Sequence, residues 1–323
     1  MSTSDIEDEG LEELWHLGVA RWRKFQKSGP QRAKEDLEEA ITWGVVTLEA
    51  LNLGARYSDP ELNVASAHYH LARYLQTKFK YYGDIEDLSA AIEHMKSCIN
   101  TAEPGEKFHA FCLSYTGELL MRRSRERGQR EDLEDGIKYI QLALVDDRYT
   151  AGNELDIEPI LNVMKVAGTC FLHRFDWIGN LEDLEKAIEL LEAASTKSVD
   201  AKYPEHESDR IAILSTLGSC YMELNYKTGS LEALESAVRC NEAAAHVQLQ
   251  TGTESSGSVQ LDLDPELTLP FGAGLTHLQR YEATGNLHEL EAAISNIQAS
   301  VERIHVQRVR DIDHSTHPDK LWQ

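Results

Sequence analysis

The chain is poor in proline and in basic residues, and both shortages narrow what it can be. Only eight of its 323 residues are proline. Because proline interrupts helices, this scarcity predicts an all-helical chain. Lysine and arginine number 32 against 55 acidic residues, which gives a net charge of −23. That balance argues against binding to nucleic acids or anionic membranes, because both attract basic surfaces.

Signals for export, membrane insertion and catalysis are also missing. The first nine residues lack the basic and apolar stretches of a signal peptide, and no apolar run approaches the ~20 residues that span a bilayer. Cys170 and Cys220 occupy equivalent repeat positions, which indicates packing and a reducing compartment. We find no Gly-x-Ser-x-Gly, Walker or His-Glu-x-x-His motif. We therefore expect a cytoplasmic or nuclear protein with no catalytic residues, cofactor or metal.

What the chain does have is a short phrase that recurs at long, regular intervals. Its pattern is Gly, a polar residue, an apolar residue, and then acids around Leu before Ala-Ile. The last residues of successive copies lie 51, 45, 51, 50 and 56 positions apart, so the phrase marks a repeat architecture. The copies are Lys34–Ile41 (degenerate), Gly83–Ile92, Gly128–Ile137, Gly179–Ile188, Gly229–Val238 and Gly285–Ile294.

Each phrase predicts a tight corner between two helices. The Gly suits the left-handed residue that ends a helix, and the polar residue after it is a good N-cap for the next helix. Three residues after the N-cap, Asp87, Asp183 and Glu289 approximate a capping box. Cations end the first helices and acids begin the second ones, and helix dipoles alone explain both signs.

Small residues recur at two further positions of every repeat and predict close contact between the paired helices. A Gly inside a helix is unfavourable by about 1 kcal/mol relative to Ala, so it needs a packing reason. The first position, eleven residues before the corner, holds Gly18, Ala72, Gly117, Gly168, Gly218 and Gly274. The second holds Ala40, Ala91, Gly136, Ala187, Ala237 and Ala293.

These small residues resemble the tetratricopeptide (TPR) signature. The match is best at Leu214, Leu217, Gly218, Tyr221, Ala237 and Ala244, although the two small sites lie 19 residues apart where the TPR has about twelve. The corner phrase is similar to the long-repeat arrays that precede caspase-like CHAT domains in fungal proteins. The resemblance implies an all-α, right-handed α-solenoid of about six antiparallel hairpins, roughly at 10–58, 59–108, 109–155, 156–205, 206–262 and 263–310.

Two segments fall outside this pattern. Gly, Ser and Thr crowd residues 250–266, which predicts a mobile insertion. Residues 311–323 resemble the loop that opens a further repeat, so we expect either a tail or the start of a truncated repeat.

The resemblance also implies a binding groove, since the first helices of TPR hairpins line the concave face. Lys165 lacks the Asn partner, at 169, of the carboxylate clamp found in chaperone-binding TPRs, so we expect a different ligand. The mixed lining suits a protein or peptide with acidic and apolar side chains. The candidates are Trp15, Trp22, Arg23, Tyr69, Arg73, Gln76, Met121, Arg122, Lys165, Leu172, His173 and Met222.

Three functions fit this sequence. The first is a non-catalytic scaffold that binds a protein partner in its groove, a prediction to be tested by charge reversal of Arg73, Arg122 and Arg123. The second is a regulatory arm that works with a CHAT-like protease or another effector. The third is a helical-repeat enzyme with a pocket on the concave face.

Overall fold

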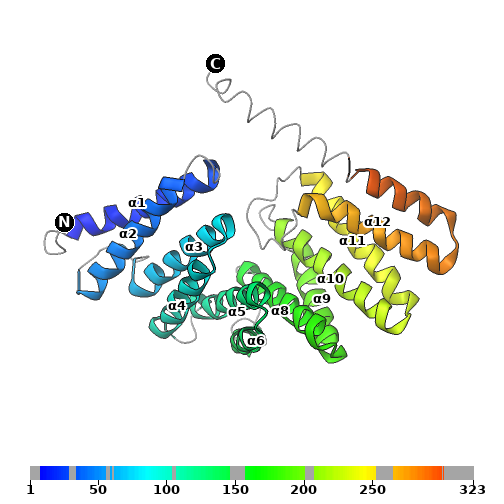
Figure 1. Cartoon of the computed structure of the whole chain (residues 1–323), viewed down its shortest axis with the longest axis horizontal. Coiled ribbons are helices and arrows are strands. Elements are labelled where there is room, and N and C mark those ends of the chain that lie inside the picture. Colours follow the sequence, from blue (N-terminus) through cyan, green and yellow to red (C-terminus); the bar gives the residue numbers. More distant parts are fainter. Residues whose placement is uncertain are drawn as a thin grey trace, which may run out of the picture. The chain divides into compact units, whose positions relative to one another are not determined.

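In the computed structural model the described residues are 8–28, 34–55, 59, 62–103, 107–145, 157–200, 207–251, 265–299 and 301. They are helical, apart from the short corners and loops between helices (Figure 1). The helices are α1 (Asp8–Ser28), α2 (Lys34–Asn52), α3 (Val64–Tyr82), α4 (Ile85–Thr101), α5 (Lys107–Arg127), α6 (Arg130–Val145), α8 (Ile157–Ile178), α9 (Leu181–Asp200), α10 (Glu207–Thr228), α11 (Leu231–Thr251), α12 (Pro265–Thr284) and a last helix at 287–299.

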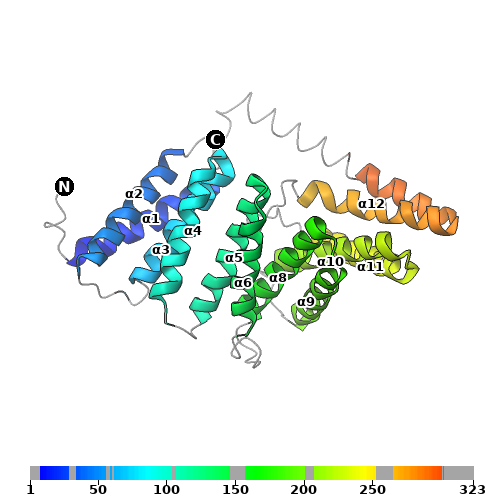
Figure 2. The same cartoon turned by 60° about the horizontal axis from the view of Figure 1, so that its bottom comes forward.

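The chain forms two compact units, Met1–Asn153 (unit 1) and Glu154–Gln323 (unit 2). In each unit the helices pair in chain order as antiparallel hairpins, and each hairpin packs on the next (Figure 2). This confirms the all-α hairpin repeat predicted from the phrase. The predicted insertion at 250–266 lies mostly outside the described residues, although α11 reaches Thr251 and α12 begins at Pro265. The predicted tail at 311–323 lies wholly outside them.

The corner glycines adopt the left-handed backbone that the sequence predicts. Their φ angles are +75°, +64°, +74°, +69° and +68° in order along the chain. At four of these corners the residue that follows caps the second helix, as predicted for Asp84, Asn180, Ser230 and Asn286. The Asn180 side chain accepts from the Glu182 N–H at 3.2 Å, for example.

The small residues allow the paired helices to touch. A Cβ on Gly117 would lie 2.8 Å from the Gly136 carbonyl oxygen, so the two small sites of this hairpin face each other. A Cβ on Gly168 would lie 2.5 Å from Leu191 Cγ. The prediction that these glycines admit a neighbouring helix is confirmed.

The capping boxes predicted at Asp87 and Asp183 are wrong, because these carboxylates turn across the corner instead. Asp87 pairs with Lys78 at 3.3 Å, and Asp183 accepts from Arg174 Nε at 2.9 Å. The equivalent Asp132 accepts from Arg123 Nε at 2.8 Å. In every case the cation lies five residues before the corner glycine and the acid four after it. At these three corners the acid of the phrase therefore forms an ion pair with the preceding helix.

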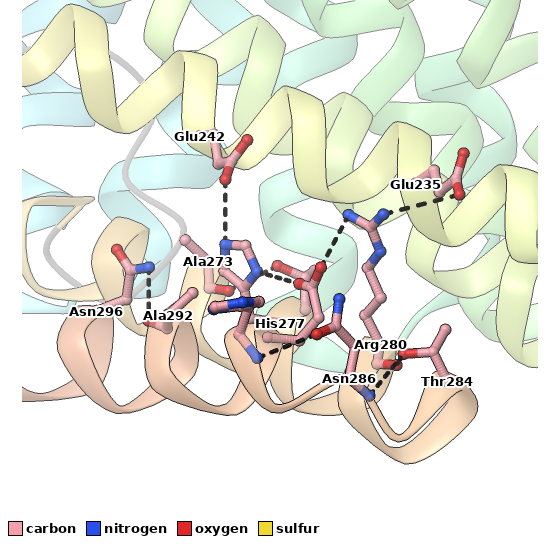
Figure 3. A network of polar contacts seen from close by, with 12 residues as sticks. Glu235, Glu242, Ala273, His277, Arg280, Thr284, Asn286, Ala292 and Asn296 are labelled. Carbon is pink, nitrogen blue, oxygen red and sulfur yellow. Dashed lines mark hydrogen bonds and ion pairs between the residues drawn. The ribbon is translucent and has the colours of Figure 1, made fainter.

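The last hairpin carries an extended version of this pair (Figure 3). Glu289, also predicted as a capping-box acid, contacts Arg280 at 3.4 Å and His277 Nδ1 at 2.8 Å. The same two side chains reach α11, where His277 Nε2 lies 3.2 Å from Glu242 and Arg280 lies 3.8 Å from Glu235. This network fastens the last hairpin to α11.

Candidate functional site

Aromatic side chains join the first helices of unit 1 into one face. Trp22 on α1 donates its Nε1–H to Thr77 Oγ1 on α3 at 3.2 Å, and Trp15 lies edge-on to His70 with centroids 4.5 Å apart. On the other side of α3, Tyr69 packs edge-on against Phe111 of α5 at 5.7 Å. We call the surface formed by α1, α3 and α5 the first-helix face.

Arg73 lies at the middle of this face, between two aromatic rings. Its guanidinium carbon is 4.5 Å from the Trp22 ring centroid and 5.6 Å from that of Tyr69. Its Nη1 donates to the Tyr69 hydroxyl at 3.1 Å. Cation–π contacts of this kind fix the plane of the guanidinium while its remaining N–H groups stay available.

Arg73 also differs from the arginines at the corners in having no carboxylate. Among the described residues it makes no ion pair, although it is only partly buried and acids greatly outnumber bases in the chain. Arg123 and Arg174, by contrast, each hold an aspartate. An arginine fixed by rings and left without an anion is suited to receive one from a ligand.

Two titratable side chains near Arg73, His70 and Tyr74, are neutral at pH 7. Burial, together with the nearby charges of Arg73 and Arg23, lowers the pKa of His70 to about 4. His70 is therefore neutral at pH 7. Burial raises the pKa of Tyr74, so this phenol also stays neutral. Neither His70 nor Tyr74 therefore adds charge beside Arg73 at neutral pH.

The structure divides the twelve predicted groove residues by their exposure. Five are buried in the packing between helices, so their side chains are not open to a ligand. Seven of the twelve predicted residues therefore remain as candidates for the lining of the groove. The buried ones are Trp15, Trp22, Met121, Lys165 and His173. The others are Arg23, which is exposed, and Tyr69, Arg73, Gln76, Arg122, Leu172 and Met222, which are partly buried.

The predicted residues of unit 2 do not gather around a cation that a ligand could use. Lys165 is buried and contacts Asp209 of α10. His173 packs edge-on against Trp177 at 5.7 Å. Leu172 and Met222 therefore lack a charged neighbour among the predicted residues, and unit 1 holds the better candidate.

Sequence reasoning missed the aromatic side of the face on α5. Phe108, Phe111 and Tyr115 all pack against Tyr69, and the Tyr115 hydroxyl donates to the Gln76 side chain. Their spacing of three and four residues was a usable signal, because it places all three on one side of a helix.

The described residues also bear on metal binding and on membrane insertion. They contain no group of three or more His, Cys, Asp or Glu side chains placed to hold a metal ion. The helices that can be described also include none long and apolar enough to cross a membrane. His68 and His94 face each other with their Nδ1 atoms 3.0 Å apart, as a pair joining α3 and α4.

Comparison with known proteins identifies the fold but no family. No family model matches the chain, and no curated protein does. Among solved structures it is similar to the nuclear import adaptor Nro1 of S. pombe, with 12% identity over 94% of this chain and 95% of that one, at a TM-score of 0.50. A thermophilic TPR protein of Thermus thermophilus shares 18% identity over 75% and 97% of the two chains, at a TM-score of 0.42. These neighbours are helical-repeat proteins of the TPR-like class.

Proposed function

We propose that this protein is a non-catalytic scaffold that binds a protein partner on the first-helix face of unit 1. The partner presents an extended or helical segment with acidic and apolar side chains. One acidic side chain pairs with Arg73, and apolar side chains lie against Tyr69 and the stem of Gln76. The observation that carries the proposal is that Arg73 is held between two rings and pairs with no carboxylate among the described residues.

The charge of the chain makes this arginine selective. With 55 acids on the protein, an acidic partner is repelled from most of the surface and is attracted where arginine is unpaired. Arg23 is exposed on α1 and adds a second cation near the same place, since its charge also acts on His70. The adaptor role of Nro1 supports a binding function for a chain of this fold.

The test uses short synthetic peptides and fluorescence anisotropy. One peptide combines Glu with Leu and Phe, and its matched partner carries Lys in place of every Glu. We expect the acidic peptide to bind more tightly. Arg73→Glu should weaken it about thirtyfold, which corresponds to the ~2 kcal/mol typical of a central interface arginine. Arg123 is unsuitable for this test, because charge reversal there would break the corner pair with Asp132.

Two further variants separate binding from folding. Arg23→Glu changes an exposed side chain and should weaken the acidic peptide less than Arg73→Glu does. Arg239→Glu on α11, an exposed arginine of unit 2, should leave its affinity unchanged. Equal affinity of both peptides, or an equal loss in all three variants, would contradict the proposal.

The other roles predicted from the sequence stay predictions. A regulatory arm acting with a CHAT-like protease would be supported by an effector encoded beside this chain. A pocket enzyme would be supported by a metabolite that raises the melting temperature. The cytoplasmic or nuclear location is tested by imaging the tagged protein in its host.

A further inference from the structure

The corners of unit 2 carry large apolar side chains that face solvent. The residue two after each corner glycine is Leu181, Leu231 or Leu287, with exposed fractions of 42%, 52% and 65%. Just before two of these corners lie Tyr226, at 79%, and Ile178, at 42%. We call the set of Trp177, Ile178, Leu181, Tyr226, Leu231 and Leu287 the corner strip.

The fold does not need apolar residues at these positions. In unit 1 the equivalents of the three leucines are Ile85, which is partly buried, and Arg130, which is exposed. The α5–α6 corner therefore forms with a charged side chain at the same site. The hairpin fold therefore does not require the three exposed leucines of unit 2.

The residues of the corner strip lie along one edge of the three packed hairpins. Because the hairpins pack in order and every corner joins a first helix to a second one, the corners share one edge (Figure 1). The Lys227 ammonium lies 5.6 Å from the Phe175 ring, which links the α10–α11 corner to the α8–α9 corner. Arg280 reaches Glu235, which links the last corner to α11 (Figure 3). A row of this kind marks an interaction site more often than a scatter of single apolar residues does.

Acidic side chains border the strip. Glu182 and Glu232 follow directly after Leu181 and Leu231 and are exposed, as is Glu282 before the last corner. Lys227, the residue after Tyr226, has its ammonium over the rings of Phe175 and Tyr226. A second copy of this chain would bring like charges together, since the net charge is −23.

We infer that the corner strip of unit 2 is a docking surface for a basic amphipathic helix of a partner protein. The apolar face of that helix covers Leu181, Leu231 and Leu287, and its flanking lysines or arginines meet Glu182 and Glu232. This site lies in unit 2 and would bind a basic partner, whereas the first-helix face lies in unit 1 and would bind an acidic one. It does not depend on the proposed function.

The experiment titrates the full chain against a labelled synthetic helix with leucines on one face and lysines beside them. A matched helix carries glutamate in place of each lysine. We expect the lysine helix to bind, its affinity to fall with added salt, and the glutamate helix to bind at least tenfold more weakly. The triple variant Leu181→Ser, Leu231→Ser, Leu287→Ser should weaken the lysine helix at least tenfold.

The matched control is Leu53→Ser, Leu142→Ser, Val145→Ser, three exposed apolar residues of unit 1, and it should bind like the unaltered protein. A second variant, Glu182→Lys with Glu232→Lys, keeps the strip and should reverse the preference toward the glutamate helix. Equal weakening in both triple variants, or no change of preference in the charge variant, overturns the inference. Binding of the chain to zwitterionic vesicles through the same leucines would assign the strip to a membrane surface and would overturn it too. Arg73→Glu should leave the lysine helix unaffected, so each proposal can fail alone.

Discussion

The ion pair at the α8–α9 corner can be tested by replacing it with the apolar pair that the chain has at its α10–α11 corner. Arg174 and Asp183 form two hydrogen bonds, from Nε at 2.9 Å and from Nη2 at 2.5 Å. The Asp183 side chain is 5% exposed and that of Arg174 21%. The α10–α11 hairpin has Leu224 and Ala233 at the equivalent positions, so there the acid and the cation are both replaced.

The magnitudes follow from this burial. Arg174→Leu leaves the Asp183 carboxylate buried without its cation, and we expect it to destabilise unit 2 by about 3–5 kcal/mol. Adding Asp183→Ala to Arg174→Leu recreates the apolar pair, and the double variant should lie within about 1 kcal/mol of the original protein. The exposed pair Lys138–Asp135 is the control, because Asp135→Ala should change stability by less than ~1 kcal/mol.

Urea unfolding followed by circular dichroism gives the global change. Hydrogen exchange of the α8 and α9 amides shows whether the loss is local, as expected for a repeat protein in which each hairpin contacts only its neighbours. A double variant as unstable as Arg174→Leu would refute the interpretation of the corner as a replaceable ion pair.

Two further predictions concern packing and pH. Gly168→Ala should destabilise the protein by ~1–3 kcal/mol, because the added Cβ would press on Leu191. Gly272→Ala has open space around it and should stabilise the protein by up to ~1 kcal/mol. Equal effects of the two variants in thermal melts would contradict the close-packing role of Gly168. Burial lowers the pKa of both His70 and His94 to about 4, so these two side chains take up protons in the unfolded chain before they do so in the folded one as the pH falls. The stability that is present above pH ~6.5 is therefore lost between pH ~6.5 and pH ~4. For His70 the loss is up to ~1.4 kcal/mol per pH unit. The urea midpoint should depend less steeply on pH in the double variant His70→Gln, His94→Gln than in the original protein. An unchanged dependence would contradict the assignment of this pH effect to the two histidines.

The local features of the fold could be predicted from the sequence. A corner glycine and the N-cap after it act over a few residues, so their pattern at Gly179 and Asn180 is sufficient to place a helix end. The small sites could be predicted as well, because a glycine such as Gly168 weakens the helix that contains it unless a neighbouring helix needs the space.

The corner pairs could not be predicted, although every residue of them is visible in the sequence. At the α10–α11 corner Leu224 and Ala233 replace both the cation and the acid, which indicates that these two positions contact each other. In the other hairpins, however, helix dipoles and caps account for the cation and the acid separately, so the sequence alone does not demand a contact. Only the angle between the two helices decides that Asp183 reaches Arg174 rather than its own N-cap.

The candidate site could be predicted in part, for a similar reason. Repeat positions identify Arg73, Tyr69 and Gln76, but the burial of Trp22 depends on a contact 55 residues away, with Thr77. Lys165 resembles a groove cation in the sequence because its partner Asp209 lies 44 residues further along the chain. Repeat position specifies which helix face a residue occupies, and it does not specify which partner the neighbouring hairpin supplies.

The most direct measurement of the binding proposal observes the arginine side chains themselves. An NMR spectrum of the arginine Nε–H groups, recorded on the full chain, is titrated with the acidic and apolar peptide. The Arg73 signal should move in proportion to the bound fraction, while those of Arg123 and Arg174, already paired with aspartates, should stay in place. A peptide that binds while the Arg73 signal stays unmoved would contradict the proposal.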